Sequence, residues 1–324
     1  MRLLYIDNLR GLAILLVVFG HIIQYVICPD SFDNNHLFRF IYSFHMPLFF
    51  IISGLTVSIE AVTKEVAIQK IKRRLIQLLC PFVAWYVITK LLLGELPSYE
   101  LFIYPDSGLW FLWALFWCAF NFYLSMMISH YTQLPPVFIL LITFLVLFLF
   151  AVFVSGLFGM GMISYYFLFY VIGGVLGRFR EIIPCIKYRY HIFIVFLAVS
   201  VLLSLLWHRD AIIIPVDEPR WICQINQSRL FRVLTALVGS VWVILLSTFT
   251  TIMGGVGKKT LGIYAIHQVM LWITPISFFD KLHFMNDGLL FVLSVVMVMS
   301  LTLLVYDLLS YRKITKVVLL GKYK

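Results

Sequence analysis

Long apolar stretches separated by short polar segments run through the whole chain. About 20 mostly apolar residues in a helix are enough to cross the hydrocarbon core of a bilayer. No linker between the stretches is long enough to divide the chain into parts. The pattern therefore predicts one domain over residues 1–324, with ten membrane-spanning helices at residues 10–28, 38–59, 75–93, 109–128, 137–154, 162–177, 191–207, 230–250, 260–279 and 288–310.

The composition excludes a soluble protein. Apolar residues make up 62% of the chain and charged residues 12%, compared with roughly 45–50% and about 25% in soluble domains. A water-facing surface cannot be built from so few polar residues. The class that remains is an all-α polytopic membrane protein, because a helix satisfies its own backbone hydrogen bonds inside the bilayer.

The net charge of +10 is explained by the loops of such a protein. Lys and Arg concentrate in the cytoplasmic loops of membrane proteins. Placing both termini inside puts most of the 25 Lys and Arg residues on one side of the membrane. We therefore expect both ends in the cytoplasm and no binding of nucleic acid. The five cysteines are scattered without metal-ligand spacing, so we expect no metal site.

The first predicted helix carries Arg10 and His21, eleven positions apart. At 100° per residue this spacing puts both side chains on one face, about 16 Å apart along the helix axis. Arg10 then lies near the cytoplasmic surface and His21 deep in the membrane. Asp7 precedes Arg10 by three residues, a spacing that permits an ion pair. A helix-start acid favoured by the helix dipole is the alternative interpretation of Asp7.

The second predicted helix places His45 at the same depth as His21 when residues are counted from the outer side. Ionisable residues at membrane depth usually face the interior of a bundle or a watery cavity. A single such histidine is typical of a packing residue. Two at matched depth, one of them aligned with an arginine, favour a functional site. Pro47 follows His45 and leaves one backbone carbonyl without its helical partner.

A basic run precedes the third predicted helix, with Lys70, Lys72, Arg73 and Arg74 clustered in a turn where that helix begins. Such a cluster is typical of an anchor on the cytoplasmic side. The alternative is an anion site, because guanidinium groups present a fork of donors that suits phosphate. On this interpretation Arg10 lies at the same membrane face and completes the site.

Three further residues are weaker candidates. Trp110 lies in an aromatic run that is typical of a membrane-interface belt. Tyr264 and His267 lie in the inner half of the ninth predicted helix, where core packing is the simpler interpretation. The segment GGVGKKT at 254–260 is not a phosphate loop, because Ile252 stands where the first glycine is required and Lys259 where Ser or Thr is required.

Several of these segments together resemble the acyltransferase-3 family of membrane acyltransferases. The matching pieces are IDNLRGLAILLVVFGH with Arg10 and His21, YSFHMPLFFIISG with His45, the basic run ending in LLCPF, LWFL at 109–112 and GIYAIH at 262–267. The resemblance implies about ten helices and the transfer of an acyl group, often acetyl, from cytoplasmic acyl-CoA. It also implies that His21 is catalytic and Arg10 essential.

The implied acceptor is a hydroxyl of a sugar, a cell-surface glycan or a lipid-linked sugar. In this picture Arg10, Lys70, Arg73 and Arg74 hold the phosphates of the donor, and its thioester reaches His21. The histidine acts as general base on the acceptor hydroxyl or carries the acyl group itself. Family members commonly have a second arginine three residues after the first in the basic run, whereas this chain has Gln77.

Two other classes of function compete with this interpretation. A secondary transporter also carries His and Arg residues near the membrane midplane. A membrane scaffold without catalytic activity is the third class. The absence of a repeat between two halves of the chain argues mildly against a transporter, and the Arg-x10-His spacing argues against both. We expect a multi-pass enzyme of a bacterial plasma membrane, with membrane lipid, acyl-CoA and a glycan as its partners.

Overall fold

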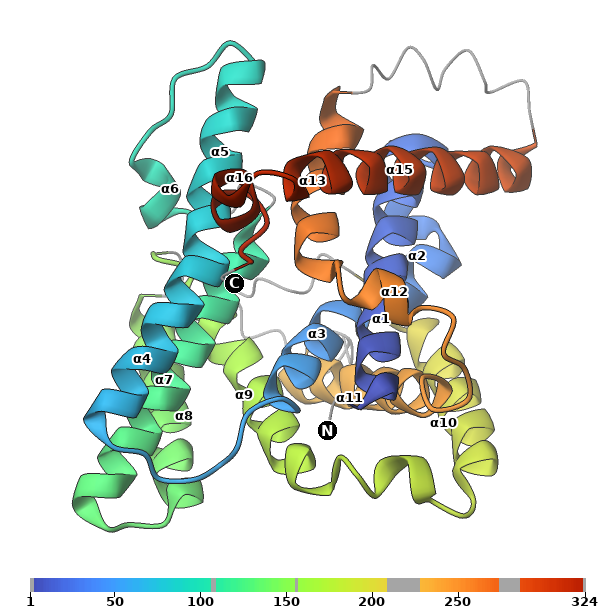
Figure 1. The fold of residues 1–324 in the computed structure, drawn as a ribbon. Helices are drawn as coiled ribbons and strands as arrows, with labels where there is room; N and C mark the ends of the chain where they lie inside the picture. The colour runs from blue at the N-terminus through green and yellow to red at the C-terminus, as the bar shows by residue number, and fades with distance from the viewer. Residues whose placement is uncertain (1–2, 106–108, 155–156, 209–227, 274–285, 323–324) are drawn as a thin grey trace. The chain divides into compact units, whose positions relative to one another are not determined.

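The computed structural model describes residues 3–105, 109–154, 157–208, 228–273 and 286–322, and every regular element in these ranges is a helix (Figure 1). The longer helices are α1 (Leu4–Ile22), α3 (His45–Gly54), α4 (Lys64–Arg74), α5 (Cys80–Leu92), α7 (Trp110–Thr132), α8 (Pro136–Phe153), α9 (Met160–Leu176), α10 (Arg189–Ser204), α11 (Arg229–Leu246), α13 (Thr260–Ile273) and α15 (Asp287–Ser310). The shorter ones are α2 (His36–Tyr42), α6 (Glu100–Ile103), α12 (Gly254–Gly257) and α16 (Lys313–Val318).

The positions of the predicted helices agree with the structure. In the described residues, eight helical segments are long and apolar enough to cross a membrane. Two more apolar helices, Arg189–Ser204 and Thr260–Leu271, are shorter. Each of the ten predicted ranges overlaps one of these segments. The prediction of an all-α polytopic fold is therefore confirmed, whereas the number of crossings and the side on which each terminus lies stay predictions.

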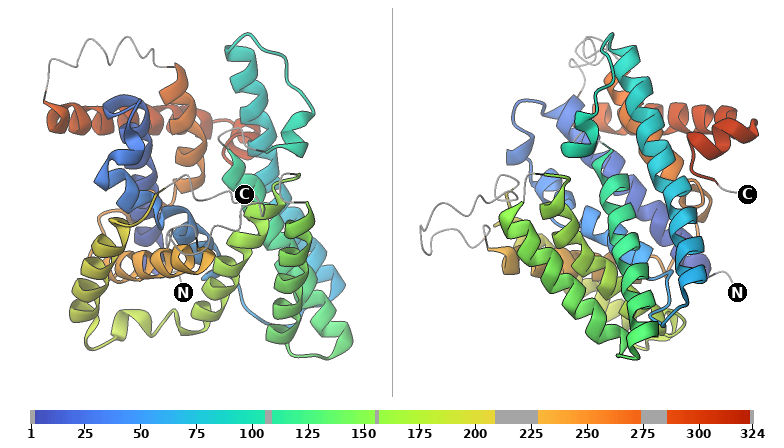
Figure 2. Two further views of the ribbon diagram at one scale, coloured as in Figure 1. Left: turned by 180° about the vertical axis from the view of Figure 1, so that it is seen from behind. Right: turned by 90° about the vertical axis from the view of Figure 1, so that its left-hand side faces the viewer.

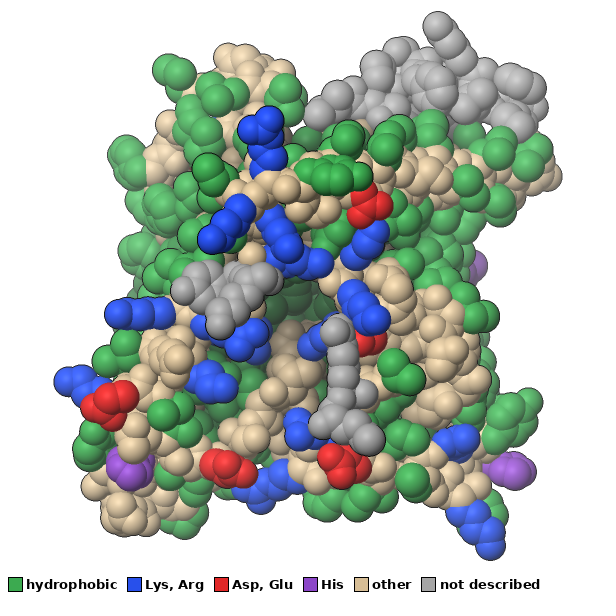
Figure 3. Space-filling model, in the orientation of Figure 1, with side chains coloured by type: hydrophobic (Ala, Val, Ile, Leu, Met, Phe, Trp, Pro, Cys, Tyr) green, Lys and Arg blue, Asp and Glu red, His purple; other side chains and the backbone are tan. Residues whose placement is uncertain are grey.

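Hydrophobic side chains cover the outer surfaces expected to meet lipid. Figure 3 shows them along α15, where Val292, Val296 and Leu304 are 54%, 58% and 57% exposed. On α8, Leu141 and Val146 are 61% and 57% exposed. Surfaces of this kind are unfavourable in water, so lipid contact is their natural environment.

The first two spans differ in detail from the prediction. Helix α1 begins at Leu4 rather than at residue 10, so that Asp7 and Arg10 lie inside it. It continues as a π-helical turn over Ile23–Ile27. The second span is broken between α2 and α3. Pro47 lies in the first turn of α3, where its missing N–H costs no helical hydrogen bond.

The turn predicted for the basic run is wrong. Lys70, Lys72, Arg73 and Arg74 lie within α4, which continues through a π-helical turn over Leu75–Leu79 into α5. The sequence KEVAIQKIKRR is rich in Lys and Arg and also contains Glu, Ala and Gln, all of which are strong helix formers. This local preference extends the third predicted helix toward the N-terminus by about three turns.

The described fold separates into two compact units. One comprises residues 1–49 and 180–304, and the other comprises residues 50–179 and 305–324. Each unit combines segments from both halves of the sequence, so neither corresponds to one continuous stretch of chain. Asp7, Arg10, His21, His45, Tyr264 and His267 belong to the first unit, and the α4 residues and Trp110 belong to the second.

In the first unit, α12 and α13 lie beside α1, as the views in Figures 1 and 2 show. Glycine makes this approach possible: a Cβ atom on Gly257 would stand 1.6 Å from the carbonyl oxygen of Asp7. A Cβ atom on Gly11 would stand 2.2 Å from the carbonyl oxygen of Met253. The GGVGKKT segment therefore serves close backbone packing against α1.

Asn8 ties the same region to α1 through hydrogen bonds. Its Nδ2 donates to the carbonyl oxygens of Ser247 and Thr250 at 3.0 and 2.6 Å, and its Oδ1 accepts from the Met253 N–H at 2.8 Å. The side chain is fully buried. Because a buried amide is costly unless its groups are paired, Asn8 holds the segment between α11 and α12 in one position.

Candidate active site

Helix α1 carries three of the candidate residues. A continuous helix from Leu4 to Ile22 separates Arg10 from His21 by about three turns. The Arg10 Nη1 lies 3.4 Å from the Asp7 Oδ1, with 3% of the Asp7 side chain and 33% of the Arg10 side chain exposed. The predicted ion pair is therefore present, and it orients the Arg10 guanidinium along α1.

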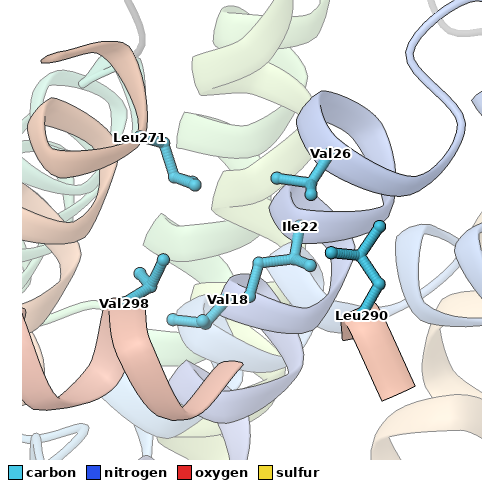
Figure 4. Packing of buried hydrophobic residues seen from close by; sticks show 6 residues of the cluster. All are labelled: Val18, Ile22, Val26, Leu271, Leu290 and Val298. Carbon is cyan, nitrogen blue, oxygen red and sulfur yellow. The ribbon is translucent and has the colours of Figure 1, made fainter. Parts of the chain in front are cut away.

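A hydrophobic cluster sets the position of α1 against α13 and α15. Figure 4 shows Val18 and Ile22 of α1 together with Val26, Leu271, Leu290 and Val298, all buried. Val18 precedes His21 by one helical turn and Ile22 follows it directly. Leu271 lies one turn after His267 on α13. In lipid, close van der Waals packing of such side chains holds helices together, so the cluster that joins these helices also determines which polar residues meet.

The cluster brings His21 against His267. The His21 Nδ1 lies 3.0 Å from the His267 Nε2, although 246 positions separate the two residues. The ring centroids lie 5.1 Å apart and the ring planes are within 13° of parallel. The His267 Nδ1 in turn lies 2.8 Å from the Ile263 carbonyl oxygen. His267 is fully buried, whereas His21 is half-buried.

Tyr42 lies between His21 and His45. Its ring centroid is 6.4 Å from that of His21 and 4.5 Å from that of His45, and its hydroxyl donates to Gln24 Oε1 at 2.8 Å. Gly20 leaves room for this ring, since a Cβ atom there would stand 2.6 Å from it. The His45 Nδ1 donates to the Ile41 carbonyl oxygen at 2.9 Å. The two histidines thus flank one tyrosine.

Sequence reasoning missed Asn8, Gln24 and Tyr42. A signal was available for Asn8 and Gln24, because each is an uncharged polar residue beside or within a membrane-length apolar stretch. Tyr42 offers no such signal, since tyrosine is common in membrane helices near the interface. Its place next to His21 follows from the packing of α2 on α1.

The remaining first-unit candidate is Tyr264, which is 4% exposed. Its ring centroid lies 6.0 Å from that of His267, so it packs beside the histidine pair. In the second unit, Trp110 stacks on Tyr166 with centroids 5.3 Å apart. The neighbouring Trp113 is buried and donates to the Phe158 carbonyl oxygen at 2.9 Å.

The basic residues of α4 form a separate candidate in the second unit. Arg73 and Arg74 follow Lys70 by three and four positions, so both lie on the same side of the helix as Lys70. Lys70 and Arg73 are exposed, and Arg74 is half-buried. The Arg74 Nη1 donates to Gln77 Oε1 over 3.5 Å. The glutamine that departs from the family pattern therefore contacts the arginine that matches it. Within the described ranges, no group of three or more His, Cys, Asp and Glu residues could hold a metal ion.

These features define an integral membrane protein in which a histidine of helix α1 contacts a histidine of helix α13. Comparison with known families assigns the class: the family described as "Acyltransferase domain" (Acyl_transf_3) matches residues 3–311. The chain belongs to this acyltransferase-3 family. Membership favours acyl transfer over the transporter and scaffold interpretations.

Two curated relatives are similar to part of the chain. Nodulation protein NolL of Mesorhizobium japonicum is 33% identical over 132 residues, which cover 36% of this chain and 34% of the relative. Nodulation protein NolL of Sinorhizobium fredii is 34% identical over 122 residues, which cover 34% of this chain and 32% of the relative. The similarity thus spans about a third of each relative. No solved structure matches the chain.

Proposed function

We propose that this protein transfers an acyl group, most simply acetyl, from acyl-CoA to a hydroxyl of a sugar or cell-surface glycan, in a bacterial plasma membrane. The observation that carries the proposal is the hydrogen-bonded pair of His21 and His267 inside the acyltransferase domain. An imidazole that is half-buried and held by a second imidazole is suited to proton transfer near neutral pH.

His21 is the proposed catalytic residue. As general base it takes the proton of the acceptor hydroxyl while the hydroxyl oxygen attacks the thioester carbonyl carbon. The carbon–sulfur bond then breaks, CoA leaves as its thiolate, and His21 returns the proton to that sulfur. In the second route the imidazole nitrogen attacks the thioester carbonyl carbon and CoA leaves as its thiolate, which gives an acyl-histidine. The acceptor hydroxyl oxygen then attacks the acyl carbon, the bond from that carbon to the histidine nitrogen breaks, and the hydroxyl proton passes through the imidazole to the CoA thiolate. Both routes use the same nitrogen of His21.

Arg10 is proposed to bind the phosphate end of the donor. Its guanidinium is the part of α1 best suited to phosphate, because it offers parallel donors in a planar fork. Asp7 contacts the Arg10 Nη1 at 3.4 Å and so keeps the guanidinium oriented. Arg74, with Lys70 and Arg73, is an independent candidate for the same chemistry on the second unit.

His45, Tyr42, Tyr264 and Trp110 are proposed as supporting or substrate-pocket residues. Tyr42 contacts the rings of both His21 and His45, so an acceptor that reaches His21 meets an aromatic neighbour. Aromatic rings are common in pockets for small molecules, where a few polar groups set the orientation.

The test is His21→Ala in a strain whose own copy of the gene is deleted. Mass spectrometry of the surface glycans should show an acetyl increment with the wild-type gene and its loss with the variant. Loss of a general base typically lowers a rate by about 10²–10⁴-fold. Exposed His191, also in the first unit, provides the matched control His191→Ala. Transfer within threefold of the control would remove His21 from the mechanism.

A further inference from the structure

The direction of the hydrogen bonds between His21 and His267 can be worked out from the carbonyl at their end. A carbonyl oxygen only accepts hydrogen bonds. The His267 Nδ1, 2.8 Å from the Ile263 carbonyl oxygen, must therefore carry a hydrogen. A neutral imidazole has one N–H and one lone pair, so the lone pair of neutral His267 lies on its Nε2, which faces His21.

Burial keeps His267 neutral. The side chain has no exposed surface and lies on an apolar helix, among Ile263, Tyr264 and Ile266, which are themselves buried. A charged imidazolium in such an apolar place loses its hydration, which is costly in free energy. Because neutral His267 accepts at Nε2, the hydrogen of the 3.0 Å contact belongs to the Nδ1 of His21.

We infer that His267 is a positioning residue that holds His21 as the tautomer with its proton on Nδ1. The proton that His21 gains or loses then always enters and leaves at Nε2. This inference rests on the proposed function only where it concerns the reaction. The nearly parallel ring planes add a second constraint, because the contact fixes the plane in which the Nε2 lone pair of His21 lies.

The hydrogen bonds from His21 to His267 and from His267 to the Ile263 carbonyl also stabilise the charged state of His21. When Nε2 takes a proton from an acceptor hydroxyl, both nitrogens of His21 carry hydrogen, and the contact with His267 remains intact. The bond from Nδ1 to the lone pair of His267 becomes charge-assisted and therefore stronger. The Ile263 carbonyl, which accepts from the far side of His267, makes that lone pair a better acceptor. The same logic holds where an acid orients a catalytic histidine.

The tautomer of His21 can be measured without any assay of activity. In protein labelled with ¹⁵N-histidine and reconstituted in lipid, nitrogen NMR separates a ring nitrogen that carries hydrogen from one with a lone pair. The His21 signals are identified by their loss in His21→Ala. We expect hydrogen on Nδ1 and a lone pair on Nε2 in the wild type. Hydrogen on Nε2 in the wild type would overturn the inference.

Three substitutions at His267 separate positioning from packing. Gln places an acceptor where Nε2 lies and should keep the wild-type tautomer. Asn reaches only the Nδ1 position, and Phe keeps the ring without hydrogen bonds, so both should shift His21 toward the Nε2–H tautomer. The matched control His191→Asn changes an exposed histidine of the same unit and should leave the His21 signals unaltered. An unaltered tautomer in the Phe variant would contradict the inference.

Activity provides the second readout. We expect His267→Phe to lower acetyl transfer to surface glycans by about 10²-fold or more, since a wrongly protonated base must first change tautomer. Acetyl transfer by the His267→Gln variant should be at least tenfold higher than by the His267→Phe variant. Equal activity of the Gln and Phe variants would contradict a positioning role. Full activity of His21→Ala would instead defeat the proposed function, while the tautomer measurement would still stand.

Discussion

Arg10 differs from the other candidates on α1 because its proposed ligand, the phosphate end of the donor, is charged. Asp7 holds one side of the guanidinium. We predict that Arg10→Ala weakens binding of acetyl-CoA to the purified protein in detergent by about 10–100-fold, since a hydrogen bond to a charged group contributes about 1.5–3 kcal/mol. Arg10→Lys should recover only part of this loss, because an ammonium lacks the planar fork.

The control for Arg10 is Lys187→Ala, an exposed cation of the same unit. It should leave the affinity for acetyl-CoA unchanged. If Arg10→Ala binds acetyl-CoA as tightly as this control, Arg10 does not contact the phosphates, even where transfer to the glycan falls.

The role of Arg74 is tested by comparison with Lys72, a cation on the opposite side of the same helix. We predict that Arg74→Ala weakens acetyl-CoA binding, whereas Lys72→Ala does not, because position 72 points away from positions 70 and 74 on a helix. Gln77→Arg should leave binding unchanged or tighten it, since it adds a second guanidinium one turn from the first. Binding in detergent is again the measurement. Equal effects at positions 72 and 74 would indicate a general effect of charge and exclude a specific phosphate contact.

Among the elements, α12 depends on glycine at one position and not at another. A Cβ atom on Gly257 would meet the backbone of Asp7, whereas one on Gly255 meets nothing within 4 Å. Backbone cannot move aside as a side-chain end can. We therefore predict that Gly257→Ala lowers the free energy of unfolding by about 1–3 kcal/mol or more, and that Gly255→Ala leaves it nearly unchanged.

Thermal unfolding of the Gly257→Ala and Gly255→Ala variants in the same detergent measures the difference in their stability directly. Since α12 leads into α13, the Gly257 variant should also disturb the contact of His267 with His21. A Gly257 variant as stable as the Gly255 variant would contradict the backbone packing described for α1 and α12.

At the scale of the whole molecule, the distribution of Lys and Arg predicts the orientation. In a background without cysteine, a probe at Tyr99 should react with a membrane-impermeant thiol reagent added from outside, whereas probes at Lys72 and Lys187 should not. All three positions are exposed. Permeabilised cells provide the control, because every probe should react there. Labelling of Lys72 in intact cells would reverse the orientation and move the acyl-CoA site to the other side.

Much of this protein follows from its sequence because the decisive forces are local or bulk properties. A chain with 62% apolar residues has no stable form in water, and in lipid its apolar stretches must satisfy their own backbone, so they form helices. The spacing of Arg10 and His21 on α1 follows equally from the helical repeat. The helix over the basic run also has a local cause, its strong helix formers, and was missed because the charge pattern was interpreted as a turn.

Only the tertiary structure decided which side chains meet. His21 contacts His267 across 246 positions because Val18, Ile22 and Leu271 bury their side chains in one cluster. Gly11 and Gly257 allow two backbones to touch, and Tyr42 reaches the space between two histidines. None of these contacts has a local signature, because each depends on shapes that come together only when distant segments pack. The sequence therefore determined the class of protein, the helices and the reactive residue types, while the packing of distant segments determined that His21 and His267 form a pair.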